Sequence, residues 1–325
     1  MTHDDVVLVG VDGSATSLHA LDWAAAEARA HGYALRLVCS YALPAFTAAS
    51  LDGGYAALDD TAIQAGAKAV LAEAQARAQD RGVSSTASVL TGDAAAVLVE
   101  MSRSARMAVV GTRGRGGFTD RLLGTVSSAL PAHAYCPTVV VPSRPEGADP
   151  GDPAPVQPVR RIVVGVDGSP ASDVALRHAI REAKVWDAEL TAVAGVPVGS
   201  GSGLLAWLPA AVDHEAVLRD IAEGLDVVID RAVADDPGVR VKRHVLDGTG
   251  AELLTEFSTA TDLIVVGSRG RGGFAGLLLG STSQAVLHHS ACPVMVVTRR
   301  CEEGGQPGTR PAARGRVRDI GDLYR

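Results

Sequence analysis

The sequence predicts an α/β fold made of two tandem copies, each a doubly wound, five-stranded parallel sheet. Three observations support this fold class. Residues 7–14 (VLVGVDGS) return as residues 162–169 (IVVGVDGS), and residues 109–118 return, with one change, as residues 265–274. Short apolar runs alternate with segments of helical period along each copy, as in sheets with helical crossovers. Several runs are continuously β-branched, which is typical of parallel strands covered on both faces.

The length of the repeat sets the domain organisation. The first pair of segments is offset by 155 residues and the second by 156, which is the length of a whole domain. We therefore predict domains at 1–142 and 161–299. Residues 143–160 contain five prolines and scattered charge, which predicts a linker. The Gly-, Pro- and Arg-rich residues 300–325 predict a disordered tail.

Each copy is expected to follow one order of elements. The first strand is a β-branched run that ends at an Asp-Gly-Ser turn, and the fourth ends at a glycine before a Gly- and Arg-rich loop. The fifth is a short apolar run after a Cys-Pro dipeptide, whose buried cysteine (Cys136 or Cys292) is expected to fill the core. Strands are expected at 6–11, 35–40, 84–90, 107–111 and 138–141, then at 161–166, 189–194, 239–246, 263–267 and 294–298. Helices are expected at 17–31, 59–81, 94–103 and 125–134, then at 172–185, 213–234, 251–260 and 281–289.

Composition excludes several classes of protein. The chain of 325 residues has a formal net charge of −7 and a sequence pI near 5.7, which argues against nucleic-acid binding. No apolar run has the roughly 18 residues needed to cross a membrane, and the first residues lack a signal-peptide pattern. We therefore expect a cytoplasmic protein. Its four cysteines show no metal-binding spacing, so no metal site is expected from the sequence.

The ligand site is expected at the carboxyl ends of the strands, where the strand order reverses. Asp12 and Asp167 close the first strand of each copy, and Gly111 and Gly267 close the fourth. The loop that follows each fourth strand leads into a helix that starts with Gly-Thr or Gly-Ser. Free N–H groups at a helix start attract anions, and hydroxyl side chains there can cap the helix or donate to phosphate.

The glycine spacing resembles the ATP-binding signature of the universal stress protein family. Gly111-x-x-Gly114, nine residues and Gly124-Thr125 fit that signature, and Gly267-x-x-Gly270, nine residues and Gly280-Ser281 fit it again. The resemblance covers about 6–142 and 160–299, as in tandem members of the family. It implies a Rossmann-like, adenine nucleotide alpha hydrolase-like fold in each copy. It also implies pairing through the fifth strand, so we expect the two copies to pair within one chain.

The resemblance implies ATP, with Mg²⁺, at up to two sites in the chain. Asp12 and Asp167 would meet the ribose. Adenine would meet backbone near the ends of the first and second strands, at Gly10, Val11 and Cys39 (38–39), and at Gly165, Val166 and Ala194 (193–194). Phosphates would contact the glycine loop and helix start, at Gly111, Gly114, Gly124, Thr125, Val126 and Ser127, and at Gly267, Gly270, Gly280, Ser281, Thr282 and Ser283. Four arginines flank these loops and could add charge: Arg113, Arg115, Arg269 and Arg271.

Simpler roles for these residues stay open. Asp12 could form only an Asx turn with Gly13 and Ser14, the glycines could only form turns, and the arginines could only face water. The chain has no GxxxxGK[ST] motif, no GxGxxG after a first strand, and no nucleophile–histidine pattern common to both copies.

We therefore expect a non-enzymatic, ATP-binding stress-response regulator. Alternatives are a nucleotide-independent signalling scaffold, a slow ATPase and an adenylate-forming enzyme. A homodimer and an unidentified protein partner stay open. The copies differ most after their second strands, at 40–54 and 195–211, which suggests unequal affinities.

Overall fold

The secondary structure follows the predicted alternation. The N-terminal half contains β1 (Asp4–Gly10), α1 (Ala15–His31), β2 (Ala34–Tyr41), α2 (Asp60–Asp80), β3 (Ser85–Thr91), α3 (Ala94–Met101), the 3-10 helix η2 (Ser102–Ser104), β4 (Ala105–Gly111), α4 (Thr125–His133) and β5 (Thr138–Val141). The C-terminal half contains β6 (Arg161–Gly165), α5 (Pro170–Trp186), β7 (Glu189–Val196), α6 (His214–Val233), β8 (Val241–Asp247), α7 (Gly250–Phe257), β9 (Leu263–Gly267), α8 (Ser281–His289), β10 (Val294–Val297) and the 3-10 helix η3 (Arg299–Glu302).

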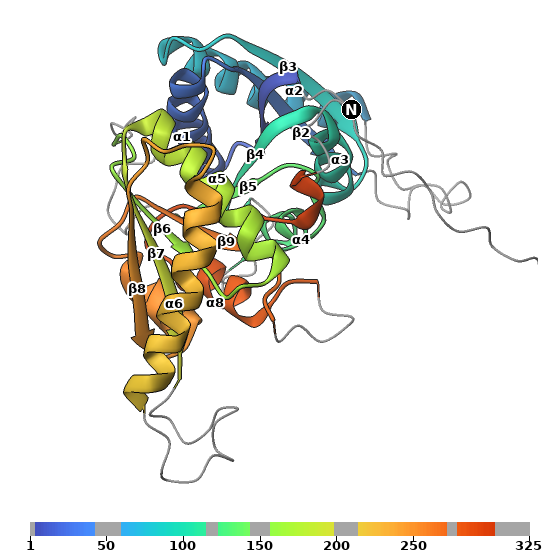
Figure 1. Cartoon of the computed structure of the whole chain (residues 1–325). Coiled ribbons are helices and arrows are strands. Elements are labelled where there is room, and N and C mark those ends of the chain that lie inside the picture. Colours follow the sequence, from blue (N-terminus) through green and yellow to red (C-terminus); the bar gives the residue numbers. More distant parts are fainter. Residues whose placement is uncertain are drawn as a thin grey trace, which may run out of the picture.

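These elements come from a computed structural model that describes residues 4–42, 60–114, 123–143, 157–197, 214–271 and 278–302. The described strands form one sheet with the order β3-β2-β1-β4-β5-β10-β9-β6-β7-β8. Figure 1 shows the two halves beside each other, the first in blue to green and the second in yellow-green to red. The predicted fold class is confirmed. The helix expected at 94–103 ends earlier, at Met101, because the Ser102 hydroxyl donates to the Val99 carbonyl at 2.6 Å and the chain tightens into η2.

The two halves pair through their fifth strands, as predicted. All neighbouring strands within a half are parallel, whereas β5 and β10 are antiparallel, with Val139 opposite Met295 and Val140 opposite Val294. Each fifth strand would be a bare apolar edge in an isolated half, and such edges favour pairing. The pairing converts two edges into the middle of the sheet.

Helices cover both faces of this sheet, and each face has a core that runs across both halves. On one face α1, α2, α5 and α6 pack over a cluster that includes Val139 and Met295. On the other face α3, α4, α7 and α8 pack over a cluster that includes Val140 and Val294. Because alternate residues of a strand face opposite sides, the short β5–β10 pair contributes to both cores.

The ends of the expected linker and tail are better ordered than their composition suggests. Val159 is buried in the core, and the backbone N–H groups of Arg160 and Arg161 donate to Asp262 Oδ2 at 2.9 and 2.8 Å. In η3, Cys301 packs against the core and Arg300 donates to the His133 carbonyl at 3.1 Å. The rest of both segments, 144–156 and 303–325, lies outside the described residues. Among the helices that the structure describes, none combines the length and apolar character needed to cross a membrane.

Candidate functional site

A cavity of about 470 Å³ lies at the carboxyl ends of β1, β2 and β4, where the strand order reverses. This is the position at which open α/β sheets bind ligands. Its lining includes most residues that the sequence predicted for the first copy: Gly10, Val11, Asp12, Gly111, Gly114, Gly124, Thr125, Val126 and Ser127. The ends of β1 and β4 and the start of α4 bring these residues together.

Asp12 and Gly114 define the polar side of the cavity. The backbone N–H and the hydroxyl of Ser14 donate to Asp12 Oδ1 at 3.0 and 2.6 Å, so the Asx turn does form. A Cβ atom at Gly114 would stand only 2.2 Å from Asp12 Oδ2. The loop after β4 therefore passes directly over this carboxylate, and only glycine leaves room for it.

Gly111 is required for a different reason. A Cβ at this position would stand 2.8 Å from the backbone carbonyl oxygen of Thr16, in the first turn of α1. Backbone atoms cannot move aside as a flexible side chain can. Gly111 therefore allows α1 to pack closely against the end of β4, in addition to lining the cavity.

The start of α4 faces the cavity without a side-chain cap. Its N-cap residue is Gly124, which makes no side-chain cap hydrogen bond. The expectation that Thr125 or Ser127 caps this helix is not met. The Ser127 hydroxyl instead donates to the Thr112 carbonyl at 2.7 Å and ties the helix to the loop. An uncapped helix start presents backbone N–H groups and a partial positive charge, which suit an anion.

The end of β2 contributes one of the two residues predicted there. Val38 lines the cavity together with Ser40, whereas the Cys39 side chain is buried in the core on the opposite face of the sheet. Side chains alternate along a strand, so a shift of one residue exchanges the two faces. The Val11 N–H already donates to the Val38 carbonyl at 2.9 Å.

The C-terminal half repeats the polar side of the site. The backbone N–H groups of Ser169 and Arg271 donate to the two oxygens of Asp167, each at 2.9 Å. Burial raises the pKa of Asp167, but the hydrogen bonds from Ser169 and Arg271 outweigh it and lower the pKa below its usual value. The Asp167 carboxylate is therefore held in its ionised form. A Cβ at Gly270 would stand 2.4 Å from Asp167 Oδ2, as at Gly114 and Asp12 in the first copy.

The remaining predicted positions of this half occupy matching places. Gly280 is the N-cap of α8 without a side-chain cap, with Ser281 and Thr282 in the first turn, and the Ser283 hydroxyl donates to the Ser268 carbonyl at 3.1 Å. Gly267 ends β9 against α5, since a Cβ there would stand 2.8 Å from the Ala171 backbone. Gly165 ends β6 and Val166 follows it, and Ala194, like Cys39, is buried in the opposite core.

The flanking arginines are exposed where the structure describes them. Arg113 is exposed at the cavity, and Arg269 and Arg271 are exposed beside the second site. The Arg271 guanidinium lies near Gly168, 3.6 Å from the place of an added Cβ. Arg115 lies outside the described residues.

Sequence reasoning missed the apolar wall of the cavity. Ala94 and Leu98 of α3, Val110 of β4 and Leu123 of the loop line it. Leu98 contacts the Gly10 position, where a Cβ would stand 2.8 Å from its Cδ1, and Leu254 stands in the same relation to Gly165. This equal placement of a leucine in both copies was the available signal.

The fold and site define a tandem α/β protein with a ligand cavity at the switch point of its sheet. The model of the universal stress protein family matches residues 5–142 and 158–298. The chain belongs to the universal stress protein family.

Relatives match over nearly the whole chain. Universal stress protein Rv2005c of Mycobacterium tuberculosis is 37% identical over 298 residues, which cover 89% of this chain and 96% of the relative. Universal stress protein Rv1996 of the same organism is 33% identical over 314 residues, with coverage of 89% and 94%. A universal stress protein structure from Archaeoglobus fulgidus has a TM-score of 0.65 at 22% identity, covering 91% of this chain and 99% of the other. It supports the shared fold.

Proposed function

We propose that this protein is an ATP-binding regulatory module of the stress response, with one site for ATP and Mg²⁺ in each half. The observation that carries the proposal is the convergence on one cavity of a carboxylate, a glycine loop and an uncapped helix start. The cavity volume of about 470 Å³ falls within the range of small-molecule sites. The family membership supports the link to stress.

The two sides of the cavity suit different parts of a nucleotide. Val38, Leu98 and Val110 form an apolar wall that matches the flat adenine ring. Asp12 can accept hydrogen bonds from ribose hydroxyls. The N–H groups at the start of α4 and the loop at Gly114 suit the phosphates, to which Mg²⁺ binds with water and few protein ligands.

Binding without turnover is the form of the proposal that the cavity favours. Among the described lining residues, Asp12 is the only carboxylate and Arg113 the only cation. The Asp12 carboxylate is engaged by Ser14. The described lining thus offers little with which to activate a water for hydrolysis. We also propose a cytoplasmic location, which fractionation of cells that produce the tagged chain would test.

Mass analysis of small molecules that co-purify with the native chain is the first experiment. Calorimetric titration of nucleotide-free protein with ATP·Mg²⁺, ADP and AMP then gives affinity and stoichiometry. We expect saturable ATP binding at two sites per chain. No binding of any nucleotide would favour the scaffold function. Phosphate release that saturates with ATP and exceeds a protein-free control would favour the ATPase.

A further inference from the structure

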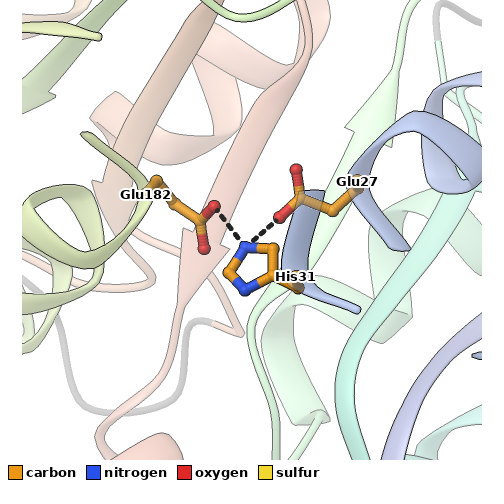
Figure 2. A group of neighbouring side chains, drawn as sticks. All are labelled: Glu27, His31 and Glu182. Carbon is orange, nitrogen blue, oxygen red and sulfur yellow. Dashed lines mark hydrogen bonds and ion pairs between the residues drawn. The ribbon is translucent and has the colours of Figure 1, made fainter. Parts of the chain in front are cut away.

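A buried cluster of two glutamates and one histidine joins the two halves of the molecule, away from the cavity. Glu27 and His31 lie one turn apart on α1, and Glu182 lies on α5 of the other half (Figure 2). The side chains of Glu27 and Glu182 are 1% and 5% exposed, and that of His31 is 13% exposed. Residues four apart on a helix share one face, so α1 presents two potential ligands to α5.

The three side chains direct one atom each toward the same point, as Figure 2 shows. His31 Nε2 is 2.8 Å from Glu27 Oε1 and 3.0 Å from Glu182 Oε2. A ring nitrogen carries at most one hydrogen, and the hydrogen bond is made with Glu182. Glu27 Oε1 is buried, and its contact with His31 is an ion pair without a hydrogen bond of its own. A buried carboxylate oxygen without a hydrogen-bond donor is costly, and a metal ion between the three ligand atoms would contact this oxygen directly.

Neighbouring aromatic residues hold the cluster in place. The Trp186 indole N–H donates to Glu27 Oε2 at 2.9 Å. Trp186 occupies the position in the second copy that His31 occupies in the first, given the offset of 155 residues. The His31 ring stacks on Tyr33 with ring centroids 5.0 Å apart. Outer hydrogen bonds of this kind commonly orient the ligands of metal sites.

The pKa values of His31 and Glu182 are both raised within the cluster. Burial lowers the pKa of His31, but the hydrogen bond with Glu182 and the negative charge of both glutamates outweigh it and raise the pKa to about 10. Burial and the charge of Glu27 raise the pKa of Glu182 to about 8. The three ligand atoms lie close enough for one divalent cation to contact all of them, and such binding generally releases protons from the ligands.

We propose that Glu27, His31 and Glu182 bind one divalent transition-metal ion, with Zn²⁺ as the best match, which fastens α1 to α5. The three ligand atoms all lie within 4.8 Å of one another. Zinc accepts imidazole nitrogen and carboxylate oxygen at about 2.0–2.2 Å in tetrahedral geometry, which places ligand atoms about 3.3 Å apart. Small side-chain rotations would open the present separations to that value. This site is independent of nucleotide.

Zinc binding to the full chain tests the proposal. Chelator-treated, nucleotide-free wild-type protein is dialysed against Zn²⁺, and a Zn²⁺-soaked crystal is examined by anomalous scattering. We expect one ion per chain, with its anomalous peak between the three named atoms, and a higher unfolding temperature. His31→Gln and Glu182→Gln should lose this ion. Trp186→Phe should keep the stoichiometry and weaken affinity about 10–100-fold, as for other outer-shell partners. His289→Gln, an exposed residue of α8, is the matched control and should bind like the wild type.

Three results would overturn the proposal. The first is wild-type protein without saturable Zn²⁺ binding, which would mean that the cluster is a hydrogen-bonded contact and not a metal site. The second is an ion that persists in His31→Gln. The third is Co²⁺-substituted protein with thiolate charge-transfer bands, which would assign the metal to cysteines. The wild-type crystal decides the matter even if the variants fold poorly.

Discussion

Replacing Gly114 with Ala is the smallest change that tests the proposed nucleotide site of the N-terminal half. The added Cβ would stand 2.2 Å from Asp12 Oδ2, whereas unstrained contacts between heavy atoms lie near 3.5 Å. The carboxylate or the loop must therefore move by about 1 Å. The carboxylate cannot rotate freely, because Ser14 donates two hydrogen bonds to Oδ1. The loop is exposed at Gly114, so we expect it to move away from the phosphates.

The displacement should weaken ATP binding far more than it weakens the fold. A shift of about 1 Å in a polar site costs up to about 100-fold, or about 2.7 kcal/mol. At a ligand concentration of 100 times Kd, the wild-type site gains about 2.7 kcal/mol of stability from the ligand. A site that binds 100-fold more weakly gains only about 0.4 kcal/mol at that concentration.

Calorimetric titration with ATP·Mg²⁺ provides the assay. Gly114→Ala and Gly270→Ala should each reduce the number of tight sites from two to one, and the double variant should have none. Gly224→Ala is the matched control, because it lies in α6 with no atom within 4 Å of the added Cβ. If both single variants retain two sites of wild-type affinity, the nucleotide does not bind beside these glycines and aspartates, and the proposed function is wrong.

Three further predictions concern stability. In a double-mutant cycle, Asp22→Asn and Arg77→Gln should show a coupling energy of about 1.5–3 kcal/mol in chemical unfolding. The reason is that the Asp22 carboxylate is buried and accepts two charged hydrogen bonds from Arg77, at 2.8 and 2.6 Å. Additive effects of the two substitutions would contradict this coupling. Burial, with Arg181 and Arg177 nearby, lowers the pKa of His178 well below its usual value. The unfolded chain therefore binds a proton at this residue more readily than the folded chain does, and the free energy of unfolding falls as the pH drops below about 6.5. His178→Gln should reduce this loss of stability by up to about 1.4 kcal/mol per pH unit. If the free energy of unfolding depends on pH as it does in the wild type, His178 is not the residue responsible. Met295→Ala should lower the free energy of unfolding by about 2–5 kcal/mol, since Met295 is fully buried in the core shared by both halves. If hydrogen exchange shows that only the C-terminal half unfolds more readily while the N-terminal half keeps its protection, the two halves do not share a core.

The repeat and the strand patterns made most of the fold predictable. The predicted bounds of β5, β9 and α8 agree with the structure at every residue. Continuous β-branched runs mark strands that are covered on both faces, and this sheet covers nearly all its strands in that way. The pairing of β5 with β10 followed from the same logic, because a short apolar edge needs a partner.

Contacts that depend on a single residue of register were not predictable. Val38 and Cys39 were both predicted at the cavity, but Val38 and Ser40 line it. A strand pattern gives the period of two but not which face carries the ligand. The Ser127 hydroxyl also donates to the Thr112 carbonyl and fastens the loop, a contact that depends on the path of the loop.

The glutamate–histidine cluster was missed because Glu182 lies 151 residues from His31 in the chain. A signal was present, however. Glu27 and Glu182 occupy the same position in the two copies, each inside a helix whose neighbouring residues are mostly buried. A charged residue repeated on a buried helix face needs a partner. Comparison of the buried polar positions of the two copies would therefore have indicated a contact between the halves.

The same comparison of copies indicates why the two nucleotide sites should differ. Ser40 lines the first cavity and donates to the Gly92 carbonyl at 2.8 Å. Its counterpart is Gly195, where a Cβ would stand 2.9 Å from Gly250 N. The loop before α7 therefore approaches β7 more closely than its counterpart approaches β2. Near the end of the second strand, the C-terminal half therefore places loop backbone where the N-terminal half has the Ser40 side chain. Matching glycine loops with unequal walls predict two affinities for ATP, and a titration that fits two identical sites would contradict that asymmetry.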